Sequence, residues 1–205
     1  MDQESIRIIF QEAKAIISGD HFVYKSGKHG SAYVNKDAVY VDPTKVFLST
    51  LEIANHFVYD DIEVVVGPAI GGVILSQWIA WHLSSLTERE VLSIYSEKEG
   101  DSFVIKRGYD KFLSGKNVLV VEDVVTTGGS VKKVIEQVLR YGGNVAGLGI
   151  LCNRGNVSFD DVPKFFSLMT VSLDAWDEKE CPLCSKGIPI NTELGKGKQF
   201  LATHK

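Results

Sequence analysis

Two adjacent carboxylates, Glu122 and Asp123, end an apolar run of the sequence and stand two residues before a turn rich in hydroxyls and glycine. A glycine turn that leads into a helix can present its backbone amides and the helix N-terminus to a phosphate group. Acids beside such a turn would repel a bare phosphate. We therefore expect them to face the ribose hydroxyls and the metal ion of a phosphorylated ligand. The turn consists of Thr126, Thr127, Gly128, Gly129 and Ser130.

An ordinary strand–turn–helix unit with a capping hydroxyl is the competing interpretation of this segment. It accounts for the glycines and the hydroxyls but not for the paired acids at the end of the strand. The other common phosphate-binding loops are excluded, because the sequence contains no G-x-x-x-x-G-K-[ST] and no G-x-G-x-x-G after a strand.

The elements that would position these residues are short apolar runs that alternate with helical patterns. This alternation predicts an α/β fold with a mainly parallel, five-stranded sheet covered by helices on both faces. In such sheets the ligand lies beyond the carboxyl ends of the strands, which directs attention to residues 67–72, 96–107, 122–130 and 152–155. The expected strands are 62–67, 91–95, 117–123, 144–152 and 165–173, after a strand–turn–strand unit at 21–36, and the expected helices are 5–18, 43–58, 71–83 and 129–141.

Length and composition narrow the class of protein. The chain has 205 residues, which fits one domain over 1–205, and a formal net charge of −4 that provides no basic surface for nucleic acid. No apolar run reaches the roughly 20 residues that span a bilayer. The charged first residues do not resemble a signal peptide, and three cysteines do not form a disulfide framework, so a cytoplasmic protein is expected.

Residues 118–130, VLVVEDVVTTGGS, resemble the PRPP-binding signature of type I phosphoribosyltransferases at all their positions. The resemblance implies that family's fold and the transfer of ribose 5-phosphate from phosphoribosyl pyrophosphate (PRPP) to a base, with Mg²⁺ as cofactor. It assigns the ribose hydroxyls and Mg²⁺ to Glu122 and Asp123 as catalytic residues, and the 5′-phosphate to 126–130. Val124 and Val125 complete the PRPP-binding segment.

Three further segments resemble orotate phosphoribosyltransferases in particular. Residues 22–35 resemble that family's amino-terminal hood, where Lys25 would reach the PRPP phosphates and Tyr33 and Val34 would lie near the base. Residues 66–75, VGPAIGGVIL, resemble the pyrophosphate loop, with Gly67, Gly71 and Gly72 as PRPP-binding positions. In 151–155, LCNRG, Arg154 would bind the orotate carboxylate, and Thr126 would also lie near the base. Taken singly, these segments also fit a surface hairpin, a strand–helix connector and a surface arginine.

The resemblance weakens at the cations. Better-known members carry a lysine where Gly71 stands. They also have a mobile loop with Arg-Lys followed by Lys and His, which corresponds here to residues 95–108. Glu97 occupies the arginine position, Lys98 matches the adjacent lysine, and the later Lys-x-His is absent. Because departing pyrophosphate needs cations, Lys98 is expected to be catalytic, and Lys106 and Arg107 are expected to substitute for the missing groups.

Residues 176–190 resemble a carboxyl-terminal extension found in one branch of the orotate phosphoribosyltransferases. Cys181 and Cys184 are spaced as C-x-x-C, which is half of a zinc site. Cys152 and the histidines show no second closely spaced pair, so zinc is not expected, although a site shared by two copies of the chain stays open.

The sequence thus predicts a type I phosphoribosyltransferase fold with a small hood, made from about 20–40 and as a further candidate part the tail 174–205. The expected substrates are PRPP and orotate, with neither nucleic acid nor membrane as a partner, and the resemblance implies a homodimer. Two alternatives stay open: a phosphoribosyltransferase for a purine or other base, and a non-catalytic PRPP-sensing regulator.

Overall fold

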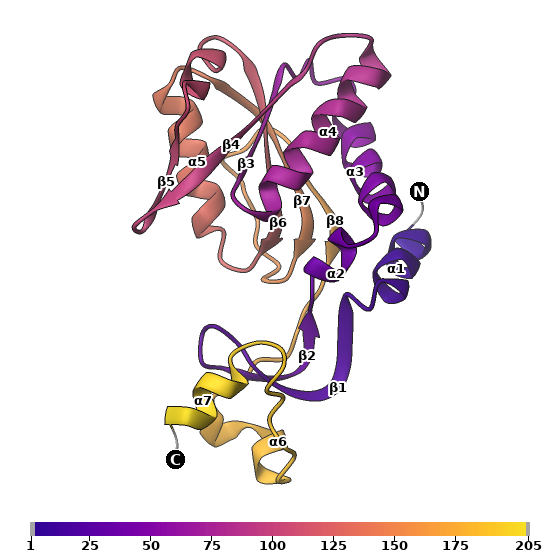
Figure 1. Ribbon diagram of the computed structural model, residues 1–205, viewed down its shortest axis with the longest axis vertical. Coiled ribbons are helices and arrows are strands. Elements are labelled where there is room, and N and C mark those ends of the chain that lie inside the picture. The colour runs from indigo at the N-terminus through magenta and orange to yellow at the C-terminus, as the bar shows by residue number, and fades with distance from the viewer. Residues whose placement is uncertain (1–2, 204–205) are drawn as a thin grey trace.

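A computed structural model describes residues 3–203 and contains a six-stranded sheet in the order β5-β4-β3-β6-β7-β8 (Figure 1). Five neighbouring strands are parallel, as predicted, and the short β5 pairs antiparallel with β4 as a sixth strand that the sequence did not indicate. The strands are β3 (Val64–Pro68), β4 (Leu92–Glu99), β5 (Ser102–Ile105), β6 (Asn117–Val125), β7 (Asn144–Asn153) and β8 (Phe165–Thr170).

Helices cover both faces of this sheet because its central strands carry apolar side chains on both sides. Val65 and Leu119 pack under α3 and α4, and Val64 and Val118 pack under α5. Alternate residues of a strand point to opposite faces, so a continuous run of valines supplies two cores. None of the helices within residues 3–203 is long and apolar enough to cross a membrane. The helices are α3 (Pro43–Phe57), α4 (Gly71–Thr87) and α5 (Gly129–Arg140), with the short α2 (Asp37–Tyr40) and a 3₁₀ turn (Tyr109–Phe112).

The first predicted helix, 5–18, is too long. Helix α1 (Gln3–Glu12) ends before Lys14, whose φ of 53° is left-handed, and strand β1 (Ile16–Val23) begins soon afterwards. The apolar residues at the end of the pattern, such as Ile16, therefore belong to a strand that pairs with β2 (His29–Val34). A short apolar run fits either element, and here the strand pairing decides.

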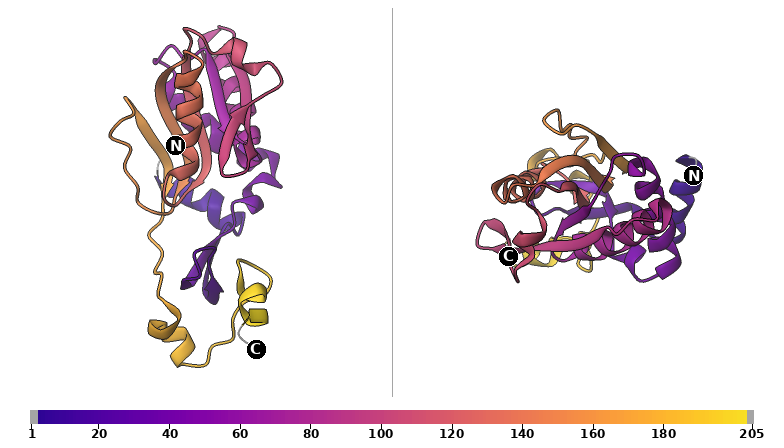
Figure 2. Two further views of the ribbon diagram at one scale, coloured as in Figure 1. Left: turned by 90° about the vertical axis from the view of Figure 1, so that its left-hand side faces the viewer. Right: turned by 90° about the horizontal axis from the view of Figure 1, so that it is seen from above.

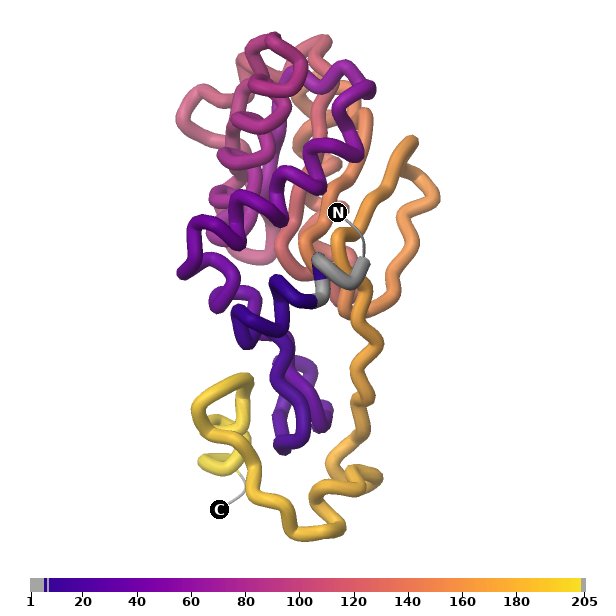
Figure 3. Tube along the Cα trace, turned by 90° about the vertical axis from the view of Figure 1, so that its right-hand side faces the viewer, coloured from indigo at the N-terminus to yellow at the C-terminus, as the bar shows by residue number. Residues whose placement is uncertain are grey.

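The β1–β2 hairpin stands apart from the sheet, and the carboxyl-terminal tail wraps around it (Figures 2 and 3). Backbone hydrogen bonds join Trp176 to His29 and Asn191 to His21, so the tail contacts both strands of the hairpin. We call the hairpin together with residues 174–203 the hood. The tail contains a 3₁₀ turn (Glu178–Glu180) and the short helices α6 (Pro182–Ser185) and α7 (Gly197–Thr203).

Candidate active site

A cavity of about 500 Å³ lies where the carboxyl end of β6 meets the hood. The hood contributes Lys25 and Ser26, the core contributes the whole turn after β6, and Arg154 follows β7. Most of the residues assigned from the sequence to phosphate and base binding thus share one cavity. Its lining comprises Lys25, Ser26, Glu122, Val124, Val125, Thr126, Thr127, Gly128, Gly129, Ser130, Val131 and Arg154.

The turn between β6 and α5 has the geometry expected of a phosphate cradle. Gly128 is the N-cap of α5 with a φ of +78°, a left-handed conformation that favours glycine. A methyl group at this position would also press against the ring of Phe159. Gly128, Gly129 and Ser130 line the cavity at the start of α5, where a helix has unpaired amides, and this arrangement suits an anion.

The two acids are almost fully buried, with 8% of Glu122 and 7% of Asp123 exposed. Burial, together with the neighbouring Asp123 charge, raises the pKa of Glu122 to about 9. Its Oε1 accepts a hydrogen bond of 3.0 Å from the Asp123 amide, and Asp123 Oδ1 accepts one of 2.6 Å from the Val124 amide. The pair is therefore held at the strand end, and ionisation of Glu122 beside Asp123 needs additional positive charge nearby.

Lys36 partly meets that need, and the sequence did not indicate it. Its Nζ lies 2.6 Å from Asp123 Oδ2. Burial alone would lower the pKa of Lys36, but the Asp123 carboxylate outweighs it and the net shift is upward. Lys36 immediately precedes α2, where a lysine is unremarkable in sequence, so only the tertiary structure identifies it.

The loop between β3 and α4 is built around close backbone approaches. A side chain at Gly67 would collide with the backbone of Gly72, and one at Gly71 would collide with the Asp123 carboxylate. The peptide bond between Ala69 and Ile70 is cis. Gly71 therefore leaves room for the Asp123 carboxylate, which forms an ion pair with Lys36.

Arg154 lies across the ring of Tyr24, with its guanidinium carbon 5.0 Å from the ring centroid. It lines the main cavity and also an adjacent one of about 290 Å³, and Thr126 and Ser26 line both. The hood thus supports an arginine of the core, as a stacked guanidinium is held in orientation by an aromatic face.

Other sequence-predicted residues are not brought into this cavity. Lys98, Lys106 and Arg107 lie on or beside the β4–β5 hairpin, where Lys106 pairs with Glu99 at 3.0 Å and Arg107 pairs with Glu97 at 2.6 Å. Tyr33 packs against Phe22 within the hood, with ring centroids 5.4 Å apart, and Val34 is buried. Their assigned roles in binding stay predictions.

The fold and the cavity define a phosphoribosyltransferase. A family model described as the phosphoribosyl transferase domain matches residues 52–183. The solved adenine phosphoribosyltransferase of Rhodothermus marinus has the same fold (TM-score 0.63, 21% identity, 83% of this chain and 100% of that one). So does an orotate phosphoribosyltransferase of Mycobacterium tuberculosis in complex with PRPP (TM-score 0.60, 17% identity, 83% and 90%).

Sequence similarity narrows the class further. An orotate phosphoribosyltransferase of Caldanaerobacter subterraneus subsp. tengcongensis is 37% identical over 190 residues, which are 93% of this chain and 96% of the relative. The chain therefore belongs to the orotate phosphoribosyltransferase family of transferases. The predicted family and fold are confirmed.

Proposed function

We propose that this protein transfers ribose 5-phosphate from PRPP to orotate, giving orotidine 5′-phosphate and pyrophosphate in pyrimidine synthesis in the cytoplasm. The observation that supports it most directly is that Arg154 shares one cavity with the turn at 126–130. A phosphate cradle and a carboxylate-binding cation in the same cavity match the two ends of the product.

The turn would receive the 5′-phosphate through the amides of Gly128 and Gly129 and the hydroxyls around them. Lys25 would approach a phosphate from the hood side. Gly67, Gly71 and Gly72 would accept pyrophosphate through backbone amides. The close approach of Gly67 to Gly72 fixes this part of the backbone beside the start of α4.

Mg²⁺ fits the donor set at the end of β6. Two buried acids face one lysine, so when both are ionised one negative charge is uncompensated. Carboxylate oxygens are suitable ligands for Mg²⁺, which usually keeps several waters and binds through substrate phosphates as well. Glu122 and Asp123 would hold Mg²⁺ together with the ribose hydroxyls. When bound, the ion would neutralise charge on the departing pyrophosphate.

In the reaction the bond between ribose C1 and a pyrophosphate oxygen breaks, a ring nitrogen of orotate forms the new bond to C1, and the proton lost from that nitrogen passes to the pyrophosphate. Positive charge develops on the ribose and negative charge on the leaving group. Glu122 and Asp123 stabilise the ribose side. Lys98, Lys106 and Arg107 would serve the leaving-group side, and the latter two would exchange Glu99 and Glu97 for pyrophosphate.

Orotate would place its carboxylate on Arg154, which can donate two parallel hydrogen bonds, and its ring near Thr126 and Tyr33. A purine is the main competing substrate, because an adenine enzyme shares the fold. The fold therefore does not decide the base. The argument for orotate rests on Arg154 in the cavity and on the similarity over most of the chain.

The test is a direct assay with PRPP, Mg²⁺ and each of orotate, adenine and hypoxanthine, in which ultraviolet absorbance follows the base. Loss of orotate that depends on PRPP is the expected result. If only a purine were consumed, the substrate would be that purine and the proposal of orotate would be wrong. PRPP binding by calorimetry without turnover of any base would indicate a PRPP-sensing regulator.

A homodimer is part of the proposal, as the resemblance implies. Helices α3 and α4 present an aromatic surface that includes Phe47, Trp78 and Trp81, and 52% of Trp81 is exposed. An aromatic surface of this kind is typical of a protein interface. Sedimentation of the wild-type chain and of Trp81→Lys tests whether a second copy covers it.

A further inference from the structure

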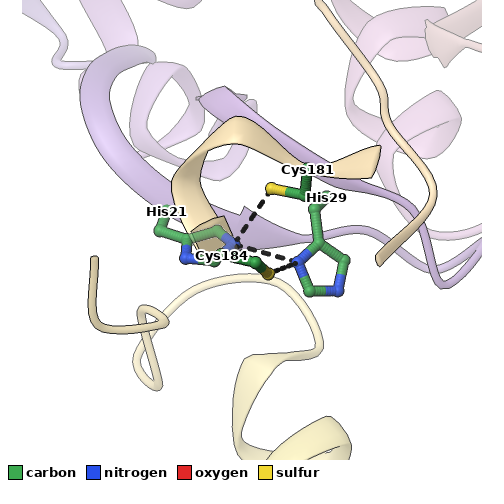
Figure 4. A group of neighbouring side chains, drawn as sticks. All are labelled: His21, His29, Cys181 and Cys184. Carbon is green, nitrogen blue, oxygen red and sulfur yellow. Dashed lines mark hydrogen bonds between the residues drawn. The ribbon is translucent and has the colours of Figure 1, made fainter. Parts of the chain in front are cut away.

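Two histidines of the hairpin and the two cysteines of the tail converge within the hood (Figure 4). None of the four lines the cavity of the candidate active site. His21 is on β1 and His29 begins β2, while Cys181 is the N-cap of α6 and Cys184 lies within that helix. One nitrogen or sulfur atom from each residue lies within 4.8 Å of every other. The sequence-based expectation that the cysteine pair lacks further ligands is therefore wrong.

The distances between these atoms are those of a tetrahedral site. Zinc bound at about 2.3 Å from sulfur and about 2.0–2.1 Å from nitrogen requires sulfur–nitrogen separations of about 3.6 Å. His21 Nε2 lies 3.6 Å from Cys181 Sγ and 3.7 Å from Cys184 Sγ, and His29 Nδ1 lies 3.3 Å from Cys184 Sγ. The two nitrogens are 2.9 Å apart, which is shorter than the roughly 3.4 Å of such a site.

The orientation of His21 is also that of a metal ligand. Its Nδ1 lies 2.8 Å from the carbonyl oxygen of Ile188, which can only accept, so Nδ1 is the donor. In the neutral ring the Nε2 lone pair then points at the two sulfurs. A backbone carbonyl that holds the second ring nitrogen is the usual support for a metal-bound histidine. His21, His29 and Cys181 are each at most 2% exposed.

A redox-active C-x-x-C pair is the competing interpretation. A redox pair leaves unexplained why two histidines, each at most 1% exposed, face the sulfurs. A tetrahedral metal site requires two further ligands at those positions.

We propose that His21 Nε2, His29 Nδ1, Cys181 Sγ and Cys184 Sγ bind one structural zinc ion. Two cysteines and two histidines fill all four positions, so the site has no open position for catalysis. The ion would join the hairpin to the tail, since His21 and Cys181 are 160 residues apart in the chain. It thereby fixes the strands on either side of the turn that carries Lys25.

The test is metal analysis of the full-length chain purified from zinc-supplemented medium without chelator. We expect one zinc per chain in the wild type, and less than a tenth of that in Cys184→Ser and in His29→Ala. Cys152→Ala and His56→Gln, which alter a cysteine and a histidine outside the cluster, are the matched controls and should keep the full content. Zinc content is measured without the transferase assay. A failure of the zinc proposal can therefore be distinguished from a failure of the proposed transferase function.

Cobalt substitution provides a second measurement on folded protein. Co²⁺ added to zinc-free, reduced wild-type chain should give the intense visible bands of a tetrahedral site with thiolate ligands, and the two variants should not. Zinc retained by the variants would overturn the proposal. So would a wild-type chain that binds neither metal after reduction, or one whose mass shows a disulfide between Cys181 and Cys184.

Discussion

The core and the hood meet at the same cavity but maintain their structure by different means. The core positions Glu122 at the end of a parallel strand that is buried on both faces, between two large hydrophobic clusters. The hood positions Lys25 on the turn of a two-stranded hairpin, and such a hairpin is at best marginally stable alone in water. Its tail adds only turns and short helices.

This difference gives a reason for the cluster of two histidines and two cysteines inside the hood. Small units that cannot bury enough apolar surface commonly depend on disulfides or metals. In the core, packed apolar strands, two backbone hydrogen bonds and the ion pair with Lys36 hold two acids beside each other. In the hood, the cluster at His21 and Cys181 performs the corresponding role, and the cavity receives a positioned cation as the result.

The core should contribute more to kcat/KM than the hood does, and Asp123→Asn measures this contribution. The substitution keeps the shape but removes a charge that serves the ribose side of the reaction. We expect kcat/KM to fall about 10²–10³-fold, the size typical of losing one preorganised electrostatic contact. Steady-state assays with PRPP, Mg²⁺ and orotate measure it, with the exposed Asp160→Asn as control. A loss below tenfold would contradict the assigned role.

Arg154→Ala tests orotate binding at the boundary between the core and the hood. Charged hydrogen bonds contribute about 1.5–3 kcal/mol, so we expect KM for orotate to rise roughly 10–150-fold. The KM for PRPP should change little, because the phosphate turn stays intact. If both KM values rose equally, Arg154 would be supporting the cavity as a whole. Arg140→Ala, at the far end of α5, is the matched control.

The hood should contribute less, and we expect its effect on the KM for PRPP to act through Lys25. Lys25→Ala should raise KM for PRPP by about tenfold, which is about 1.4 kcal/mol. If the metal cluster mainly positions Lys25, His29→Ala should add little in the Lys25→Ala background. A double-mutant cycle on KM for PRPP measures this coupling. Fully additive effects would show that the hood supports the cavity by another route.

The same contrast explains what could be predicted from the sequence. The parallel strands and the turn at 126–130 are local patterns, in which neighbouring residues carry both the structure and the chemistry. Lys36 reaches Asp123 only through tertiary packing. The pair of His21 and His29 is spaced across a hairpin, and it meets Cys181 only because the tail folds back. Sequence spacing does not encode such contacts.

The smallest effect concerns the stability of the core without ligand. The pKa of Glu122 is raised from about 4.5 in the unfolded chain to about 9 in the folded one. Between these pH values the folded protein retains a proton that the unfolded chain releases, so its stability falls as pH rises through this window. Glu122→Gln should remove that dependence and raise the melting temperature at pH 8 by about 2–4 °C, or about 1 kcal/mol. Thermal unfolding of the zinc-loaded, PRPP-free chain from pH 5 to 9 measures it, with the exposed Glu90→Gln as control. If the melting temperature of wild type and of Glu122→Gln changed equally with pH, the charge of Glu122 would already be balanced by its neighbours. The two regions would then differ less than the burial of Glu122 indicates.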